Sequence, residues 1–343
     1  MKRFFFTILF LLFALLTQAK GISWESEFDI DLTYNSNILN YSENDRDAFE
    51  NNINPEKFLI ESLDDMIMGF KYNLKSRYYS FDGHTQIINL GINYKKYLNN
   101  EIKDDINVQA GIKQYFSPKL ITSLSYSFYP EIYLRQYKSV IDNEYHNYEY
   151  AKNGYSAELE WKALKNLDLR LNADYSQLYF NEWFTEYDAD VITANCYLIW
   201  KLNPRLTTEF RYAFRIATAD AEEAYQPASV SVIKDGSFDG NIIGVKLKFR
   251  RFLADYTLNL GYRLEDKFYS SGFEGDDYHI ERDDYIHTGS MSIYVPLAKN
   301  LNMVLHAEYE ERETRSPFTN VIRDKEYNTW NSGISFAYDL KHR

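Results

Sequence analysis

The stretch WESEFDIDLTY, from Trp24 to Tyr34, alternates acidic and mostly apolar side chains. The acids occupy every second position, at Glu25, Glu27, Asp29 and Asp31. In an extended strand, successive side chains point to opposite faces. The stretch is therefore predicted to form a strand with one apolar face and one acidic face, and the rest of the chain must explain what environment accepts both.

The same alternation returns along the chain in about fourteen segments, the last of them between Trp330 and Leu340. These segments are about ten residues or longer, as a tilted membrane-crossing strand requires, whereas strands of soluble sandwiches are mostly about five to six. Their polar faces carry charges too dense for a packed interior. The pattern predicts an all-β fold, a transmembrane antiparallel up-and-down β-barrel of about fourteen strands.

The connections between these segments alternate in length. The short ones are residues 79–84, 117–119, 163–166, 202–205, 250–251 and 298–300. The others are mostly long and polar, and they are residues 35–65, 98–105, 137–152, 181–190, 217–241, 269–284 and 313–326. Short periplasmic turns and long external loops are typical of outer-membrane barrels, and an even strand number predicts that both chain ends are periplasmic.

The first residues predict export. A positive start, Lys2-Arg3, precedes an apolar run, and Thr17 and Ala19 are the small residues of a cleavage site. Residues 1–19 are therefore predicted to be a signal peptide, with cleavage after Gly21 as the alternative, and residues 20–343 to be a single barrel domain. Cys196 is the only cysteine, so no intrachain disulfide is expected.

Pairing the first two strands as a hairpin predicts a ladder of charges. Partners whose residue numbers sum to 102 place Glu25 by Arg77, Glu27 by Lys75, Asp29 by Asn73 and Asp31 by Lys71. Opposite charges across strands contribute roughly 0.2–1 kcal/mol each. One interpretation is a charge ladder that stabilises the wall, and the other is an ion-selective lining of the lumen.

Further charged side chains fall on the predicted lumen face. Basic residues gather on the ninth to eleventh segments, and these are Arg211, Arg215, Lys246, Lys248 and Arg263. Acidic residues on the thirteenth segment, Glu308 and Glu310, oppose them. Facing arcs of opposite charge create a transverse field that discriminates solutes by charge. The alternative is that these charges only neutralise one another across the wall.

Several predicted external loops are acidic, above all residues 35–65 and 269–284. Clustered carboxylates could bind Ca²⁺, or bridge lipopolysaccharide phosphates through it, but no EF-hand spacing is present, and solvated charge is the alternative. Residues 35–65 and 217–241 are the best candidates for a loop that folds inward. The histidines lack metal-ligand spacing, and His306 has no serine paired with it by sequence, so neither metal site, cofactor nor enzymatic activity is predicted.

The last segment reads NSGISFAY, with a polar Asn331, then Gly333, then the aromatic Phe336 and Tyr338. This arrangement resembles the C-terminal assembly signal of bacterial outer-membrane β-barrel proteins. The resemblance implies insertion by the barrel-assembly machinery and contact with outer-membrane lipid and lipopolysaccharide. By strand count the chain is similar to the small monomeric porins and to the fatty-acid transporters.

These observations predict an outer-membrane channel for passive or weakly selective passage of small polar or charged solutes. The alternative is a structural or surface-binding barrel that acts through its acidic external loops. The formal net charge of −12 argues against a general nucleic-acid partner, which would need a basic face.

Overall fold

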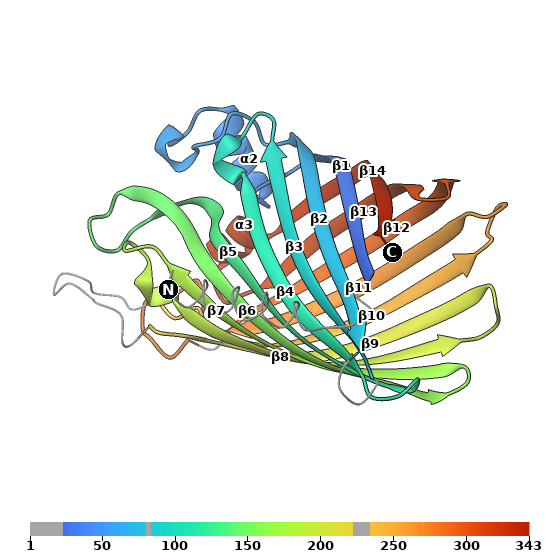
Figure 1. Cartoon of the computed structure of the whole chain (residues 1–343). Coiled ribbons are helices and arrows are strands. Elements are labelled where there is room, and N and C mark those ends of the chain that lie inside the picture. The colour runs from blue at the N-terminus through green and yellow to red at the C-terminus, as the bar shows by residue number, and fades with distance from the viewer. Residues whose placement is uncertain (1–22, 80–83, 222–233, 270, 343) are drawn as a thin grey trace, which may run out of the picture.

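The alternating segments become long strands in the computed structural model, which describes residues 23–79, 84–221, 234–269 and 271–342 (Figure 1). The strands are β1 Ser23–Asn35, β2 Asp65–Tyr79, β3 Thr85–Tyr97, β4 Asp105–Tyr115, β5 Leu120–Lys138, β6 Tyr145–Leu164, β7 Leu167–Phe180, β8 Ala189–Lys201, β9 Leu206–Ala219, β10 Phe238–Arg250, β11 Thr257–Tyr269, β12 Arg282–Ala298, β13 Leu301–Arg315 and β14 Tyr327–His342. Short helices lie in the loops, at α2 Glu43–Glu50, η1 Pro55–Lys57, η2 Glu101–Lys103, η3 Thr185–Tyr187 and α3 Thr319–Lys325. The predicted signal peptide lies outside the described residues.

The fourteen strands close into one antiparallel barrel. Each strand pairs with its neighbours in the chain, and β1 pairs with β14 to complete the ring. Trp24 lies opposite His342, so the start of β1 and the end of β14 meet at the same end of the barrel. Closure leaves no unpaired strand edge in the wall, as a membrane-spanning sheet requires. The predicted fold class is confirmed.

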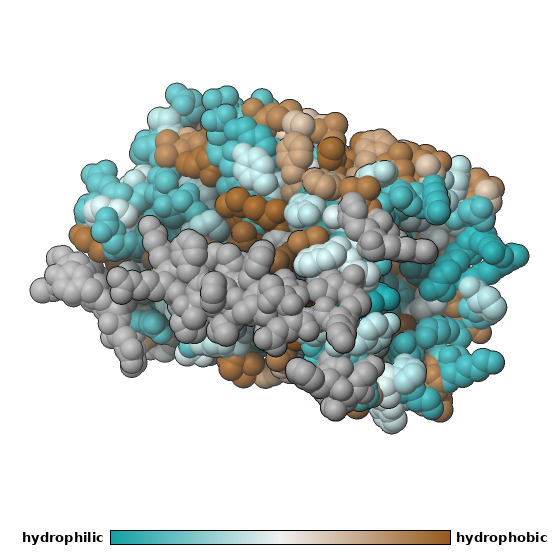
Figure 2. Space-filling model, viewed as in Figure 1, coloured by the Kyte–Doolittle hydropathy of each residue, from teal (hydrophilic) through white to brown (hydrophobic). Residues whose placement is uncertain are grey.

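Apolar side chains cover the outside of the barrel. On β1, the outward Phe28 and Ile30 are 50% and 51% exposed, an arrangement that water would not stabilise. Figure 2 shows apolar residues gathered over β1, β2 and β14, with hydrophilic residues towards both ends of the barrel. Exposed aromatic residues border this band, among them Trp161 and Trp200 towards the short turns and Trp330 towards the long loops. Such a surface is suited to lipid.

The register of the first hairpin differs from the prediction. Glu25 lies opposite Lys75 and Asp29 opposite Lys71, so partner numbers sum to 100 instead of 102. Arg77 lies opposite Ser23, and Asp31 faces Gly69. A slip of two residues keeps every side chain on its face, so alternation alone cannot distinguish the two registers. The 29-residue loop between the strands does not fix the register either.

Three predicted connections are also corrected. Residues 137–152 mostly continue the strands β5 and β6, which form a long hairpin with a turn at residues 139–144. The end of the predicted loop 269–284 belongs to β12, which starts at Arg282. The turn after β10 covers residues 251–256 rather than two residues. The first two differences arise because polar, tyrosine-rich strand ends lack the apolar alternation on which the prediction depended.

The loop between β1 and β2 packs over the mouth of the barrel. Its Tyr41 and Phe58 are buried with Tyr97 of β3 and Tyr133 of β5 in a hydrophobic cluster. This loop therefore contacts strands well beyond its own hairpin. Among the described residues, no helix has the length and apolar character that a membrane span needs.

Candidate functional site

The described residues line three cavities inside the barrel. The largest, here called the mixed cavity, has a volume of about 1110 Å³ and is lined mainly by β1–β3 and β9–β14. A second of about 780 Å³, the basic cavity, is lined by β5–β9, by the loop ends of β10–β14 and by the loops over them. A connecting cavity of about 230 Å³ shares Glu209, Lys246 and Glu308 with the mixed cavity and Arg211 with the basic cavity. The cavities thus follow one another through the lumen.

The mixed cavity has balanced charges. Its walls carry the carboxylates of Asp29, Asp31, Glu209 and Glu308 and the ammonium groups of Lys71, Lys95, Lys246 and Lys248. Lys71 Nζ lies 3.5 Å from Asp29 Oδ2, and both side chains keep contact with water. Half-exposed pairs of this kind contribute little to stability, but they keep the cavity polar.

The basic cavity is far from balanced. Among the described residues, its lining includes eight basic side chains and a single carboxylate, Asp174. The cationic residues are Arg135, Lys152, Arg211, Arg215, Lys267, Arg282, Arg312 and Lys325. An excess of one sign inside a low-dielectric wall concentrates the field in the cavity and attracts anions.

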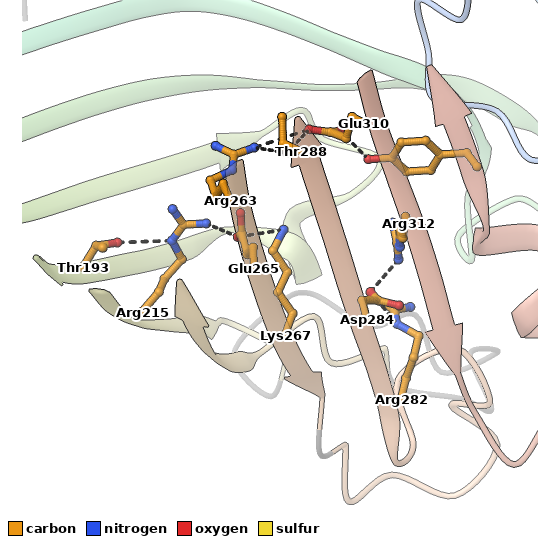
Figure 3. A network of polar contacts seen from close by, with 11 residues as sticks. Thr193, Arg215, Arg263, Glu265, Lys267, Arg282, Asp284, Thr288, Glu310 and Arg312 are labelled. Carbon is orange, nitrogen blue, oxygen red and sulfur yellow. Dashed lines mark hydrogen bonds and ion pairs between the residues drawn. The ribbon is translucent and has the colours of Figure 1, made fainter. Parts of the chain in front are cut away.

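Two buried carboxylates hold four of these cations in place (Figure 3). Glu265 Oε1 lies 2.5 Å from Arg215 Nη1 and 3.4 Å from Lys267 Nζ. Asp284 Oδ2 lies 2.5 Å from Arg312 Nη2 and 3.3 Å from Arg282 Nε. The side chains of Glu265 and Asp284 are only 8% and 1% exposed, so the cations stand between these carboxylates and the cavity. Each carboxylate serves two cations, and positive charge is left over.

Three more cations have no carboxylate partner among the described residues. Arg211 donates to Asn195 Oδ1, with Nη2 at 2.7 Å, and Lys152 lies over the ring of Tyr129. Lys325 of α3 lies over the ring of Tyr278. Burial, followed by repulsion from Arg282, Arg135 and Arg312, holds the pKa of Lys325 well below its usual range.

Aromatic residues also line the basic cavity, most of them on β5–β7 and η3. The Tyr148 ring packs on Phe180 with centroids 4.9 Å apart, and on Tyr187 at 5.3 Å. Tyr150 also contacts Phe180, with centroids 5.0 Å apart. Tyr269 lies under the guanidinium of Arg282, which is 3.7 Å from the ring centroid. The rings come from β6, β7, η3 and β11, so the tertiary structure assembles them.

The structure distributes the predicted lumen residues among these cavities. Arg211 and Arg215 line the basic cavity, Lys246 and Lys248 the mixed cavity, and Arg263 the connecting cavity. Within the first hairpin, Lys75 Nζ is 3.0 Å from Glu27 Oε2, the predicted pair, although the two lie diagonally in the observed register. Asp31 faces Gly69 and accepts from Thr33 Oγ1 at 2.5 Å, so its predicted pairing with Lys71 is wrong.

Other charged residues meet through β13. Arg263 Nη2 lies 3.3 Å from Glu310 Oε2, and the other oxygen of Glu310 accepts from Tyr327 Oη at 2.8 Å. His306 Nε2 contacts Thr33 Oγ1 at 3.0 Å. Thr33 Oγ1 also donates to Asp31, so the tautomer of His306 with its proton on Nε2 can donate to the same hydroxyl oxygen.

Sequence reasoning missed much of the basic cavity. Lys267, Arg282, Arg312 and Lys325 were not recognised as lumen residues, nor was the aromatic side. The strand alternation could have identified two of these residues. On β12 the inward positions continue beyond the apolar part to Asp284 and Arg282, and on β13 they continue to Arg312 and Thr314. Lys325 lies in a loop helix, where the period of a strand gives no indication.

Many loop acids proved to be internal. Asp45 is buried against Lys57 Nζ at 2.5 Å and Arg135 Nη1 at 3.6 Å. Asp65 accepts from three successive backbone N–H groups, including Asn100 N at 2.8 Å. Asp276 is fully buried beside His279. Within the described part of the chain, no group of three or more His, Cys, Asp or Glu side chains could hold a metal ion.

The C-terminal motif lies at the seam that closes the barrel. Phe336 and Tyr338 point outward opposite Ile30 and Phe28, whereas Gly333 lies between Thr33 and His306. A Cβ atom at Gly333 would meet Leu32 O at 2.5 Å. The glycine thus permits close approach of the first, thirteenth and last strands.

A closed ring of strands with an apolar outside and a charged, hollow inside is now established. The fold is that of an outer-membrane β-barrel. No known protein family matches the sequence, and no curated protein matches it. The barrel resembles solved structures, including the anion-selective porin of Comamonas acidovorans, with a TM-score of 0.47 and 7% identity over 93% of this chain and 99% of the porin.

Two further solved structures show the same degree of likeness. A loop-deletion mutant of OmpT, an outer membrane protein of Vibrio cholerae, has a TM-score of 0.47 and 11% identity over 93% of this chain and 99% of its own. OccAB4 of Acinetobacter baumannii has a TM-score of 0.43 and 9% identity over 95% and 99% of the two chains. At these scores, the function of the present barrel has to be inferred from its own lumen.

Proposed function

We propose that this protein is an outer-membrane channel through which small polar solutes pass, with a preference for anions. The succession of three water-accessible cavities, joined by shared lining residues, carries the proposal. Solutes entering at the loop end meet the basic cavity first and then the balanced charges of the mixed cavity. The apolar outside contacts lipid and lipopolysaccharide, and both chain ends face the periplasm.

The excess of cations in the basic cavity supports the preference for anions. A monovalent anion within about 8 Å of one uncompensated charge gains roughly 0.5 kcal/mol even in water, and more beside a low-dielectric wall. Several such charges act together in the basic cavity, whereas those of the mixed cavity oppose one another. The burial of the loop acids Asp45, Asp65 and Asp276 weighs against a barrel whose role is to present acidic loops.

The test is conductance of the refolded barrel in a planar bilayer under a salt gradient. We expect steady steps of current and a reversal potential whose sign indicates that the channel prefers anions. Heat modifiability on a gel verifies that the inserted protein is folded. A silent bilayer with folded protein would sink the channel, and a reversal potential on the cation side would sink the anion preference.

Thiol labelling provides a matched control for the route through the lumen. Ser290 lines both the mixed and the connecting cavity, and Cys196 is exposed on the outer surface. A bulky thiol reagent should reduce the conductance of Ser290→Cys in a Cys196→Ala background. The same reagent should leave the protein with Cys196 as its single thiol unchanged, since that thiol lies outside the solute path.

A further inference from the structure

The basic cavity differs from a simple anion-selective pore because it presents both cations and aromatic rings. Most of its cations come from β9 and β11–β13, where Arg215 and Lys267 share Glu265, and Arg282 and Arg312 share Asp284 (Figure 3). Its rings come mainly from β5–β7 and η3, while Tyr269 of β11 lies under Arg282. A solute within the cavity therefore meets a mainly cationic surface, here called the cationic wall, and a mainly aromatic surface, here called the aromatic wall.

The cationic wall is suited to a carboxylate rather than to a diffuse negative field alone. Arginine presents planar, directional donors that match the two oxygens of a carboxylate. Buried Asp284 and Glu265 position these side chains from behind and leave donors directed to other partners. The Arg312 side chain remains 18% exposed although Asp284 is buried. An incoming anion would contact the exposed part of this guanidinium.

The aromatic wall adds recognition of a ring. Tyr148, Tyr150, Phe180 and Tyr187 form a continuous contact series with neighbouring centroids 4.9 to 5.3 Å apart. Aromatic faces stabilise flat apolar surfaces by stacking, with roughly 0.5–1.5 kcal/mol beyond area burial for aromatic pairs. Tyrosine also offers a hydroxyl at the rim of the ring, which suits a partner that is apolar on its face and polar at its edge.

Hydroxyl groups cover part of the remaining surface. Ser125, Ser127, Ser156 and Ser176 line the basic cavity together with Asp174, the one carboxylate of its lining within the described part of the chain. Serine hydroxyls both donate and accept, and a carboxylate accepts from hydroxyl donors. This surface favours a ring that carries hydroxyl groups of its own, that is, a sugar ring over a benzene ring.

We infer that the basic cavity is a binding site for ring-bearing carboxylates, with sugar acids as the preferred class, held between the cations of β9 and β11–β13 and the Tyr148–Tyr187 ring series. The inference rests on the proposed channel function and gives it a substrate class. The carboxylate contacts the cations, the ring face lies on the aromatic wall, and the ring hydroxyls contact the serines. Entry and exit involve no covalent chemistry.

The experiment uses four probes, three of them sodium salts and one a neutral sugar. Glucuronate combines a ring, hydroxyls and a carboxylate, and glucose lacks the charge. Benzoate has the ring and charge without hydroxyls, and lactate has the charge without a ring. Each is added to the loop side of single channels, where transient current blocks give its dissociation constant, and each is titrated by calorimetry into the detergent-solubilised barrel.

Glucuronate is expected to bind at least tenfold more tightly than glucose and lactate, because it alone of these three uses both walls. Benzoate decides the ring chemistry: weaker binding than glucuronate supports the sugar acid, and tighter binding overturns that preference in favour of aromatic acids. Equal binding of lactate and glucuronate would show that charge alone acts and would overturn the inference. Equal binding of glucose would do the same.

Variants locate the site. Lys152→Gln with Arg211→Gln removes two cations that have no carboxylate partner among the described residues, so no buried acid is left unpaired. At least a tenfold loss of glucuronate binding is expected. Lys248→Gln, in the mixed cavity, is the matched control and should change binding less than twofold. A loss of the same size in both would overturn the placement in the basic cavity.

The ring series is tested in the same way. Tyr150→Leu should weaken glucuronate severalfold, while Tyr179→Leu, whose side chain is 46% exposed on the outer face of β7, should not. A silent bilayer with folded protein would end the proposed channel function, and calorimetry would then decide the binding inference by itself. Normal conductance without glucuronate binding would overturn the inference and leave the channel standing.

Discussion

The mixed and basic cavities occupy one lumen, yet their charges are organised in opposite ways. In the mixed cavity, four carboxylates and four ammonium groups share the wall, and pairs such as Lys71 and Asp29 remain partly exposed. In the basic cavity, carboxylates such as Asp284 are withdrawn behind the arginines. When the carboxylate is buried in the wall and the basic side chain lines the cavity, the cavity surface carries a net positive charge. An ion pair with both side chains exposed to the cavity leaves that surface neutral.

The largest expected effect breaks this arrangement at its buried acid. Asp284→Asn leaves Arg282 and Arg312 near one another without their carboxylate, and removing one partner of a buried ion pair costs about 3–5 kcal/mol. Denaturant unfolding of the barrel in vesicles measures this loss. The control Asp29→Asn, at a partly exposed pair, should cost no more than about 1 kcal/mol. Equal losses would contradict the distinction between the cavities.

A smaller effect concerns the seam that closes the wall of the mixed cavity. Gly333→Ala places a Cβ within 2.5 Å of Leu32 O and 2.6 Å of Thr33 Oγ1, and the strands must shift to accept it. We expect a loss of about 1–3 kcal/mol in unfolding experiments, a typical cost of overpacking. Gly289→Ala is the control, because nothing lies within 4 Å of its added Cβ. If both substitutions cost the same, close approach at the seam is not the reason for Gly333.

Salt should reduce the electrical difference between the cavities. The Debye length falls from about 10 Å at 0.1 M to about 3 Å at 1 M, so the field of the basic cavity is screened. The anion preference measured by reversal potential should therefore shrink severalfold between these concentrations. The double variant Lys152→Gln with Arg211→Gln should show a weaker anion preference at 0.1 M salt, and that preference should fall less on going to 1 M salt. A preference independent of salt would indicate a steric origin.

The smallest expected effect is a pH dependence beside the aromatic wall. Burial raises the pKa of Glu186, in η3, to about 7. A raised carboxyl pKa means that the folded state holds its proton longer, so this stabilisation is complete below about pH 4.5 and is lost as pH rises towards 7. From pH 6 to pH 8 the stability should fall by about 1 kcal/mol. Glu186→Gln should remove that dependence in unfolding experiments.

The exposed neighbour Glu182 provides the control for this titration. Glu182→Gln should leave the pH profile of the wild-type protein in place. A profile that stays the same in Glu186→Gln would assign the titration to another group.

The strand count, the closed barrel and the faces of its side chains were all predictable from the residues. The stretch from Trp24 to Tyr34 shows which side chains face the lumen and which face outward, because side chains along a strand alternate with a period of two. Each later segment shows the same alternation. The same rule identified Arg211, Arg215, Lys246, Lys248 and Arg263 as lumen residues. Local alternation is sufficient for these conclusions, since each depends only on which face a side chain occupies.

Only the tertiary structure decided the register of the first hairpin and the content of the basic cavity. A slip of two residues between β1 and β2 leaves every side chain on the same face of the sheet. The choice between partners whose residue numbers sum to 100 and partners whose numbers sum to 102 therefore depends on strand pairing around the whole ring. The basic cavity joins Tyr148, Arg215, Arg312 and Lys325, which are far apart in the chain and partly beyond the apolar strand segments. Strand tilt and loop packing bring them together, and neither is encoded in the local alternation of side chains.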